Sequence, residues 1–206
     1  MKPSKARTHW YDGAFYARFV DPWLRGVRRT VCSLVERGSS VLDVGCGTGA
    51  LAVRLAPQCS RVVGVERSPR MADVARRRAA ERSRRNVTIL QGDAAGVEVG
   101  NDFDYAVASL VLHGAPRRER TTLIRTMRDA ARAIIVVDYA AADLSPVQRL
   151  LMTIPELLAG PGHFRHFRSY LSEGGAAELL QRHGLQPEQC ITAPGGNYRI
   201  VLAAPE

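Results

Sequence analysis

The stretch VLDVGCGTGA, residues 41–50, combines an acidic side chain with a glycine-rich turn. Asp43 lies in an otherwise apolar run, where an unpaired carboxylate is costly, so we expect it to meet a cationic or hydrogen-bonding group such as a ligand ammonium. Gly45, Gly47 and Gly49 follow at every second position. Glycine tolerates a positive φ and has no side chain to keep a ligand away. The turn is therefore a candidate ligand site, although similar turns in α/β folds also occur without a ligand.

The glycine spacing differs from two common nucleotide motifs. A dinucleotide turn has G-x-G-x-x-G and a phosphate loop has G-x-x-x-x-G-K-[ST], whereas this turn reads Gly-Cys-Gly-Thr-Gly and lacks lysine. Two acids follow at the ends of later apolar runs, Glu66 in RVVGVE and Asp93 after VTILQG. Glu66 can accept bonds from both hydroxyls of a ribose, and Asp93 can accept one from an adenine amino group. Each acid also suits an ordinary helix cap, but the ordered set favours a nucleoside-containing ligand.

Short runs rich in valine, isoleucine and leucine alternate with helical patterns along the chain. The expected strands are residues 40–45, 61–66, 86–92, 102–112 and 133–139, and the helices between them are 50–58, 68–84 and 116–132. Nearly continuous apolar strands separated by helices are typical of a parallel sheet buried on both faces. The pattern therefore predicts a doubly wound α/β fold, followed by helices over about 146–183 and two late strands at 187–193 and 198–204.

Composition narrows the class of protein. A chain of 206 residues with 46% hydrophobic content predicts one sizeable core and a single domain. The sequence shows neither a signal peptide nor an apolar run long enough to span a bilayer, so we expect a cytoplasmic protein. The widely spaced cysteines argue against a zinc site and a disulfide framework, and no metal is expected. These cysteines are Cys32, Cys46, Cys59 and Cys190.

The net charge of +9 comes almost entirely from arginine, since only Lys2 and Lys5 among the 29 basic residues are lysine. The densest run, residues 76–85, has the period of an exposed helix face around Met71, Ala79 and Ala80. A solvated helix face is one interpretation of this run. An anionic partner, such as nucleic acid or a membrane surface, is the other.

The runs VLDVGCGTGA, VVGVERSPRM, VTILQGDA and DFDYAVASLVLH resemble the successive motifs of class I S-adenosylmethionine-dependent methyltransferases. They are most similar to the small bacterial ubiquinone and menaquinone type, the methyltransferase type 11 group. The resemblance covers residues 9–140 and implies a seven-stranded, mostly parallel Rossmann-like sheet with a C-terminal antiparallel hairpin. The implied layout is one methyltransferase domain with a helical lid at 1–38, a cofactor-binding core at 39–140, an acceptor-side helical insertion at 141–185 and terminal strands at 186–206.

The resemblance assigns S-adenosyl-L-methionine to these motifs. The glycine turn would surround the methionine part, Glu66 would bind the ribose, and Asp93 would bind the adenine edge. Glu66 stands where aspartate is common in the family, and its longer side chain can make the same ribose contact. Cys46 is expected to contribute only its small size. The implied cofactor-binding candidates are Tyr11, Tyr16, Asp43, Gly45, Cys46, Gly47, Gly49, Glu66, Arg67, Met71, Asp93, Ala94, Ser109 and Val111.

The methyl acceptor is harder to infer. A sulfonium methyl group is already a strong electrophile, so the protein mainly aligns a nucleophile behind it at about 3 to 3.5 Å. A general base is needed only when the acceptor must lose a proton. His113 is either a base, a wall of the pocket or a buried, hydrogen-bonded histidine, and Tyr139 is either a donor to the acceptor or a tyrosine on the rim of the core. The catalytic candidates are His113, Tyr139, His163 and His166.

Residues 162–171, GHFRHFRSYL, combine aromatic and basic side chains. If this segment is helical, His163, Phe167 and Tyr170 share one face and His166 lies beside them. Such a face suits an aromatic or anionic acceptor, although a helix that packs its aromatic residues and solvates its arginines gives the same pattern. A metal site at His163 and His166 is disfavoured, because no further ligand cluster is evident.

The leading hypothesis is a methyltransferase acting on a small molecule that is aromatic or anionic, as a monomer or homodimer. A lipid or quinone head group is an alternative acceptor, because Trp10, Phe15, Phe19 and Trp23 with nearby arginines can rest on an anionic membrane or serve as a lid. A non-catalytic, cofactor-binding regulatory protein is a second alternative. A nucleic-acid substrate is not expected, because SLVLH stands where amino-methylating enzymes carry an N-P-P-[YF]-like tetrapeptide.

Overall fold

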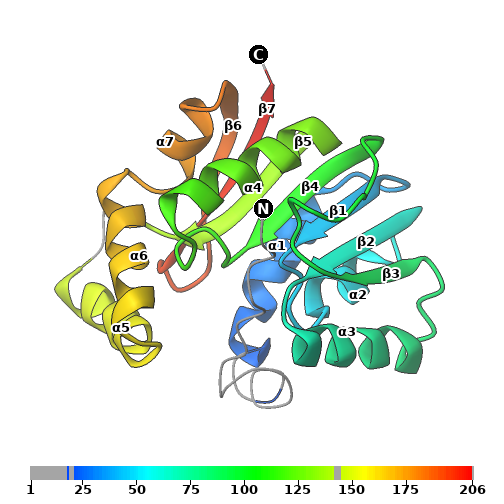
Figure 1. Cartoon of the computed structure of the whole chain (residues 1–206), viewed down its shortest axis with the longest axis horizontal. Coiled ribbons are helices and arrows are strands. Elements are labelled where there is room, and N and C mark those ends of the chain that lie inside the picture. Colours follow the sequence, from blue (N-terminus) through cyan, green and yellow to red (C-terminus); the bar gives the residue numbers. More distant parts are fainter. Residues whose placement is uncertain (1–17, 19–20, 142–144, 206) are drawn as a thin grey trace. The chain divides into compact units, whose positions relative to one another are not determined.

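The computed structural model in Figure 1 describes residues 18, 21–141 and 145–205. Its strands form a seven-stranded sheet in the order β3-β2-β1-β4-β5-β7-β6. The chain divides into two compact units, residues 1–104 and 105–206, which are described separately below. The candidates Tyr11 and Tyr16 lie outside the described residues, as do Trp10, Phe15 and Phe19.

The first unit contains the glycine-rich turn. Its elements are η2 (Asp21–Leu24), α1 (Arg25–Leu34), β1 (Ser40–Val44), α2 (Ala50–Leu55), β2 (Arg61–Glu66), α3 (Pro69–Glu81) and β3 (Val87–Gln91). Strands β1, β2 and β3 pair in parallel, with Asp43 opposite Gly64. Because the three strands run the same way, the residues after each of them gather at one edge of the sheet.

Helix α3 shows how the arginine-rich run is accommodated. Its buried face is built from small or flexible apolar side chains, including Met71 and Ala79, while Arg76 and Arg77 are exposed. The expected amphipathic helix is therefore present. It ends at Glu81, earlier than predicted, and Ala80 is exposed rather than buried.

Strand β4 (Phe103–Ser109) crosses the boundary between the units, and the second unit contains the remaining elements. They are α4 (Arg117–Ala130), β5 (Ala131–Tyr139), α5 (Pro146–Leu158), α6 (Pro161–Ser172), α7 (Ala176–Gln181), β6 (Leu185–Thr192) and β7 (Tyr198–Pro205). Strand β7 pairs antiparallel with both β5 and β6. The predicted α/β fold and its terminal antiparallel hairpin are confirmed.

Local sequence explains several element boundaries. Prolines occupy the first positions of α3, α5 and α6, where the missing N–H has no helical partner to lose. The strand expected over 102–112 was predicted too long. It ends at Ser109, because Leu110 takes a left-handed φ of 59° and its N–H donates to the Val137 carbonyl at 2.8 Å. Within residues 21–141 and 145–205, no helix is both long and apolar enough to cross a membrane.

Candidate active site

The glycine turn after β1 is held against the end of β2. The backbone N–H groups of Gly45 and Cys46 donate to the Val65 carbonyl at 2.8 and 3.1 Å. Gly47 and Gly49 both have positive φ, at 56° and 69°. A Cβ at Gly49 would lie 2.8 Å from the Ala75 Cβ, whereas a Cβ at Gly47 would meet nothing within 4 Å. Gly49 thus allows close packing on α3, and Gly47 leaves room for a ligand to approach the backbone.

Asp43 is the unusual side chain of this turn. It is 1% exposed, and its Oδ2 has no hydrogen-bond partner among the described residues. Burial raises the pKa of the Asp43 carboxyl to about 7, with Glu66 adding to the increase and Arg28 opposing it. A buried carboxylate oxygen without a donor needs one. The ammonium of an amino-acid ligand has the right charge and donor groups, so Asp43 fits the methionine part of S-adenosylmethionine.

Glu66 ends β2 as predicted and holds the turn in place. Its Oε2 accepts the Gly47 N–H at 2.9 Å, and its Oε1 accepts the Ser68 N–H at 2.7 Å. A carboxylate at the end of β2 has the acceptor chemistry that ribose hydroxyls require. The same side chain therefore positions the glycine turn and remains suited to the predicted ribose contact.

The other candidates of the first unit have local structural partners. Asp93 Oδ2 lies 3.3 Å from an Arg67 nitrogen, and its Oδ1 accepts the Ala95 N–H at 3.1 Å. Met71 and Ala94 are buried. Cys46 packs in a small apolar cluster with Ala72, Ala75 and Ile89. A Cβ on Gly64 would lie 2.8 Å from the Cys46 sulfur, which agrees with a residue selected for its small size.

A buried acid near the N-terminus was missed by sequence reasoning. Asp21 is 6% exposed and pairs with Arg28 and with Arg78, whose nitrogen lies 2.8 Å from Oδ2. The same oxygen accepts the Thr48 hydroxyl at 2.7 Å. Thr48 belongs to the glycine turn, so Asp21 ties the turn to α1 and α3. Thr48 and Arg78 lie 27 and 57 residues from Asp21 in the sequence, so no periodic pattern indicates these contacts.

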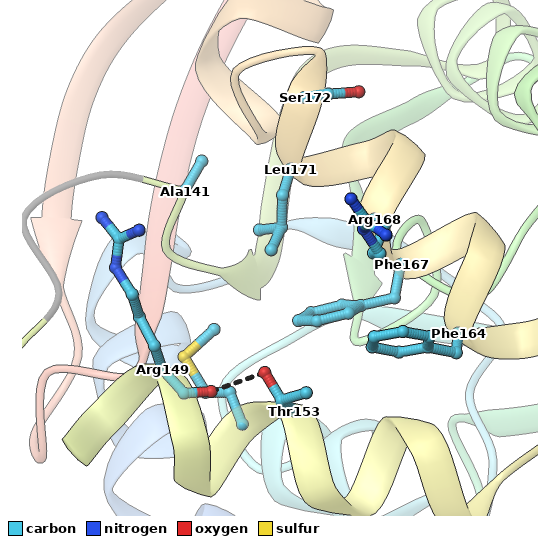
Figure 2. A pocket seen from close by; sticks show the side chains of 9 residues that line it. Ala141, Arg149, Thr153, Phe164, Phe167, Arg168, Leu171 and Ser172 are labelled. Atoms are coloured by element: carbon cyan, nitrogen blue, oxygen red, sulfur yellow. Dashed lines mark hydrogen bonds between the residues drawn. The ribbon is translucent and has the colours of Figure 1, made fainter. Parts of the chain in front are cut away.

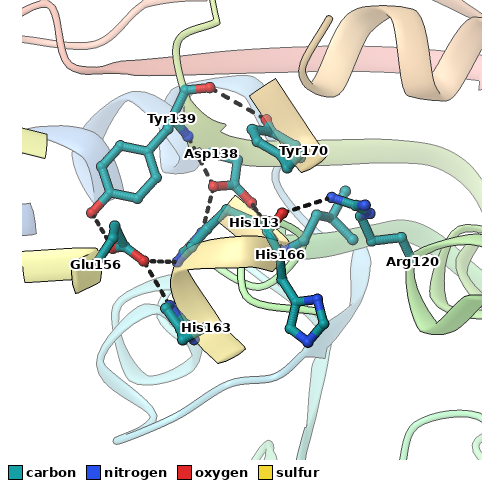
Figure 3. A network of polar contacts seen from close by, with 9 residues as sticks. His113, Arg120, Asp138, Tyr139, Glu156, His163, His166 and Tyr170 are labelled. Carbon is teal, nitrogen blue, oxygen red and sulfur yellow. Dashed lines mark hydrogen bonds and ion pairs between the residues drawn. The ribbon is translucent and has the colours of Figure 1, made fainter. Parts of the chain in front are cut away.

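In the second unit, Asp138 anchors the segment that follows β4. Its Oδ1 lies 2.7 Å from His113 Nδ1, and its Oδ2 accepts the backbone N–H groups of Leu112 and His113 at 2.9 and 3.1 Å. Figure 3 shows this carboxylate between His113 and Tyr139. The histidine tautomer with its proton on Nδ1 satisfies the contact, and Nε2 is then left for another partner.

That partner is Glu156 of α5, which sequence reasoning did not identify. Tyr139 donates its hydroxyl to Glu156 Oε1 at 2.7 Å. Glu156 Oε2 lies 2.6 Å from His163 Nε2 and 3.6 Å from His113 Nε2. Burial disfavours the carboxylate, but His163, His113 and Tyr139 outweigh it and lower the pKa of Glu156. Burial likewise disfavours the His113 imidazolium, yet Asp138 and Glu156 raise its pKa overall.

The aromatic rings of this cluster pack edge to face. His113 lies 4.8 Å from Tyr139 and 5.5 Å from His163, and Tyr139 lies 5.2 Å from Phe167, measured between ring centroids. Gly114 makes room for His163, since a Cβ there would lie 2.6 Å from the His163 Cε1. The structure thus brings together three of the catalytic candidates, His113, Tyr139 and His163.

The remaining candidates of the second unit lie elsewhere. Figure 3 shows the His166 ring directed away from Glu156. The backbone carbonyl of His166 accepts a hydrogen bond from Arg120 at 3.3 Å. Ser109 ends β4, and Val111 follows the left-handed Leu110. Both are partly exposed. Their roles beside the sulfonium stay a prediction.

Helices α5 and α6 also line a pocket of about 420 Å³ (Figure 2). Its wall combines apolar and basic side chains, among them Arg149, Met152, Phe164, Phe167 and Arg168. Phe167 belongs to both the pocket and the aromatic cluster. The pocket and the cluster therefore share the Phe167 side chain.

The sheet order and the antiparallel hairpin are those of the class I S-adenosylmethionine-dependent methyltransferase fold, and this chain resembles that class. Residues 41–133 match a family described as a methyltransferase domain. The narrower likeness to the ubiquinone and menaquinone enzymes stays a prediction.

Several individual proteins are similar to this chain. A magnesium-protoporphyrin O-methyltransferase from Rhodobacter capsulatus is 42% identical over 148 residues, which cover 71% of this chain and 62% of that protein. The uncharacterized methyltransferase YcgJ from Bacillus subtilis (strain 168) is 30% identical over 136 residues, covering 65% of this chain and 52% of that protein. The chain thus spans between half and two thirds of these relatives.

Solved structures agree on the fold. The magnesium protoporphyrin IX methyltransferase of Synechocystis PCC 6803, with bound SAH, has a TM-score of 0.63 at 23% identity, covering 91% of this chain and 80% of that one. The PH0226 protein of Pyrococcus horikoshii OT3 has a TM-score of 0.70 at 17% identity, covering 97% of both chains. The cofactor of the class is S-adenosylmethionine.

Proposed function

We propose that the protein transfers a methyl group from S-adenosylmethionine to a small-molecule acceptor that is aromatic or anionic. The observation that carries the acceptor class is the pocket between α5 and α6, with aromatic rings from Phe164 and Phe167 and guanidinium groups from Arg149 and Arg168. Its volume of about 420 Å³ is in the usual range for small-molecule sites. Arginine favours carboxylates and other planar anions.

On the donor side, the bound cofactor supplies an electrophilic methyl group. Asp43 receives the ammonium of its methionine part, and the open backbone at Gly47 allows that part to approach. Glu66, at the end of β2, accepts hydrogen bonds from the ribose hydroxyls. Arg67 and Asp93 form an ion pair that positions the Asp93 carboxylate for the adenine edge.

On the acceptor side, the pocket orients the body of the acceptor and the polar cluster receives its reactive group. Phe167 joins these two parts, because it lines the pocket and contacts the rings of Tyr139 and His113. Similarity to the Rhodobacter capsulatus relative, a magnesium-protoporphyrin O-methyltransferase, supports an oxygen of an aromatic molecule as the methylated atom. This assignment to the present chain is part of the proposal.

A methyl-transfer assay with an acceptor panel tests the proposal. Release of S-adenosylhomocysteine is measured with phenols, aromatic carboxylates and neutral analogues. We expect turnover with one anionic aromatic class and a raised KM in Arg168→Ala, with unchanged affinity for S-adenosylhomocysteine. Arg165→Ala is the matched control, because Arg165 is an exposed arginine of α6 outside the pocket wall. Cofactor binding without turnover on any acceptor would favour the non-catalytic regulatory protein instead.

A lipid or quinone head group is a second candidate acceptor, favoured by the outer face of α5. Val147, Leu150, Ile154 and Leu157 are exposed and recur at the spacing of one helix face. An exposed apolar stripe of this kind suits the interface of a membrane. Sedimentation with anionic liposomes tests this version. Liposome binding that is lost in Leu150→Glu would support a lipid or quinone acceptor. Absence of binding at low salt would exclude it.

A further inference from the structure

We propose that His113, His163 and Glu156 form a divalent metal site. Two imidazole nitrogens and one carboxylate oxygen converge, and these three atoms all lie within 4.8 Å of one another. The residues come from three separate places in the second unit: the segment after β4, helix α5 and helix α6. Two histidines and a carboxylate are a common ligand set for zinc and for other transition metals.

Two of the three ligands, His113 and Glu156, each contact a second polar side chain. Asp138 Oδ1 lies 2.7 Å from His113 Nδ1, which leaves Nε2 facing Glu156. The Tyr139 hydroxyl donates to Glu156 Oε1 at 2.7 Å, which leaves Oε2 facing the two histidines. Metal-binding histidines usually donate their other ring N–H to a carboxylate or carbonyl, and metal-binding carboxylates are also hydrogen-bonded. The groups around the three ligands thus have the arrangement that a metal site requires.

Distances around Glu156 Oε2 allow an ion with small adjustments. This oxygen is buried and accepts no well-directed hydrogen bond from the described residues. It lies 2.6 Å from His163 Nε2 and 3.6 Å from His113 Nε2. A tetrahedral ion with ligand bonds near 2.1 Å separates its ligands by about 3.4 Å. The His163 contact must therefore lengthen by less than about 1 Å, and His163 has room to move because its side chain is 21% exposed.

The charges of the cluster also fit a divalent cation. Asp138 and Glu156 place two buried carboxylates around the histidines, while Arg120 pairs with Glu173 at 2.9 Å. One divalent cation with neutral imidazoles balances the two carboxylates.

Three protein ligands leave at least one coordination position open, as in catalytic rather than structural zinc sites. An oxygen of the methyl acceptor suits that position, and the ion would act there as a Lewis acid. This last step rests on the proposed function. The existence of the site does not, because it follows from contacts within the second unit alone.

Metal binding to the full chain tests the proposal. The protein is stripped with EDTA and titrated with Co²⁺, with the visible absorption bands as the signal, and bound Zn²⁺ is measured by atomic emission after dialysis. We expect one equivalent of either ion per chain, and at least tenfold weaker binding in His163→Ala and in Glu156→Gln. His166→Ala is the matched control, because this histidine of the same helix is directed away from Glu156 (Figure 3), and it should bind as the parent does.

Three results would overturn the metal site. Stoichiometric binding that persists in His163→Ala, with the variant's circular dichroism unchanged, would place the ion elsewhere. Absence of stoichiometric binding in the parent would show that the three side chains do not form a metal site. A thiolate-to-cobalt band would indicate the exposed Cys190 instead. Calorimetry with S-adenosylhomocysteine reports separately on the cofactor, so failure of the proposed function and failure of the metal site are distinguishable.

Discussion

Substitution of Asp43 by asparagine should remove a pH dependence from the stability of the ligand-free protein. Burial raises the pKa of this carboxyl from 3.8 to about 7. A raised pKa in the folded state means that folding is favoured by protonation, so the contribution of Asp43 is fully present below about pH 4 and is lost as the pH rises through 7. The loss amounts to about 4 kcal/mol at pH 8. Asparagine cannot ionise and should show no such loss.

The assay is urea unfolding followed by circular dichroism at several pH values from 4 to 8. The measured quantity is the free energy of unfolding of the parent minus that of Asp43→Asn, because this difference cancels the other titrating groups. It should fall by about 4 kcal/mol across the range. Asp73→Asn is the control, since Asp73 is an exposed carboxylate paired with Arg76 and should show almost no difference. A difference that stays constant from pH 4 to 8 would show that burial does not raise the pKa of Asp43.

Cofactor binding should show the opposite pH trend. A ligand ammonium favours the ionised Asp43 carboxylate, so the affinity for S-adenosylhomocysteine should rise as the pH increases through 7. A hydrogen bond to a charged group is worth about 1.5–3 kcal/mol, so Asp43→Asn should bind this ligand at least about tenfold more weakly at pH 8. Titration calorimetry measures both effects. Equal affinity of parent and variant at pH 8 would show that the ammonium does not contact Asp43.

Three further substitutions probe the contacts around the site. Asp21→Asn should lower the free energy of unfolding by about 3 kcal/mol in urea, because it weakens the buried pairs to Arg28 and Arg78. Tyr139→Phe should cost about 1–3 kcal/mol in the same assay, since Glu156 Oε1 loses its donor while the ring packing remains. Gly114→Ala should cost about 1–3 kcal/mol and weaken Co²⁺ binding, because its Cβ would displace the His163 ring. A free energy of unfolding equal to that of the parent would contradict each of these.

The positions of the glycine turn and of Glu66 in the fold could be predicted from sequence because their determinants are local. An apolar run that ends in glycines marks both a strand and the turn after it, and the same rule located Glu66 at the end of β2. The strand predicted over 102–112 is longer than the observed β4, because an apolar composition does not reveal that Leu110 adopts a left-handed conformation.

Glu156 could not be predicted, because α5 is buried on the face opposite to the one its pattern indicates. Leu150, Ile154 and Leu157 form the more obvious apolar stripe, yet they are exposed, while Met152 and Glu156 are buried. A periodicity argument would place Glu156 in solvent. Its burial depends on partners that follow from tertiary structure, namely the Tyr139 hydroxyl and the two histidines.

The Asp43 turn and the His163 cluster lie in different units, so their functions are separable by experiment. The contacts described for Asp43 come from the first unit, and those described for His163 come from the second. Asp43→Asn should therefore weaken S-adenosylhomocysteine binding and retain one equivalent of Co²⁺. His163→Ala should weaken Co²⁺ binding and retain the affinity for S-adenosylhomocysteine. If metal removal abolishes methyl transfer while cofactor affinity is retained, the ion acts on the acceptor. If transfer continues without the ion, the polar cluster serves the acceptor through its own side chains, and the metal site has a separate role.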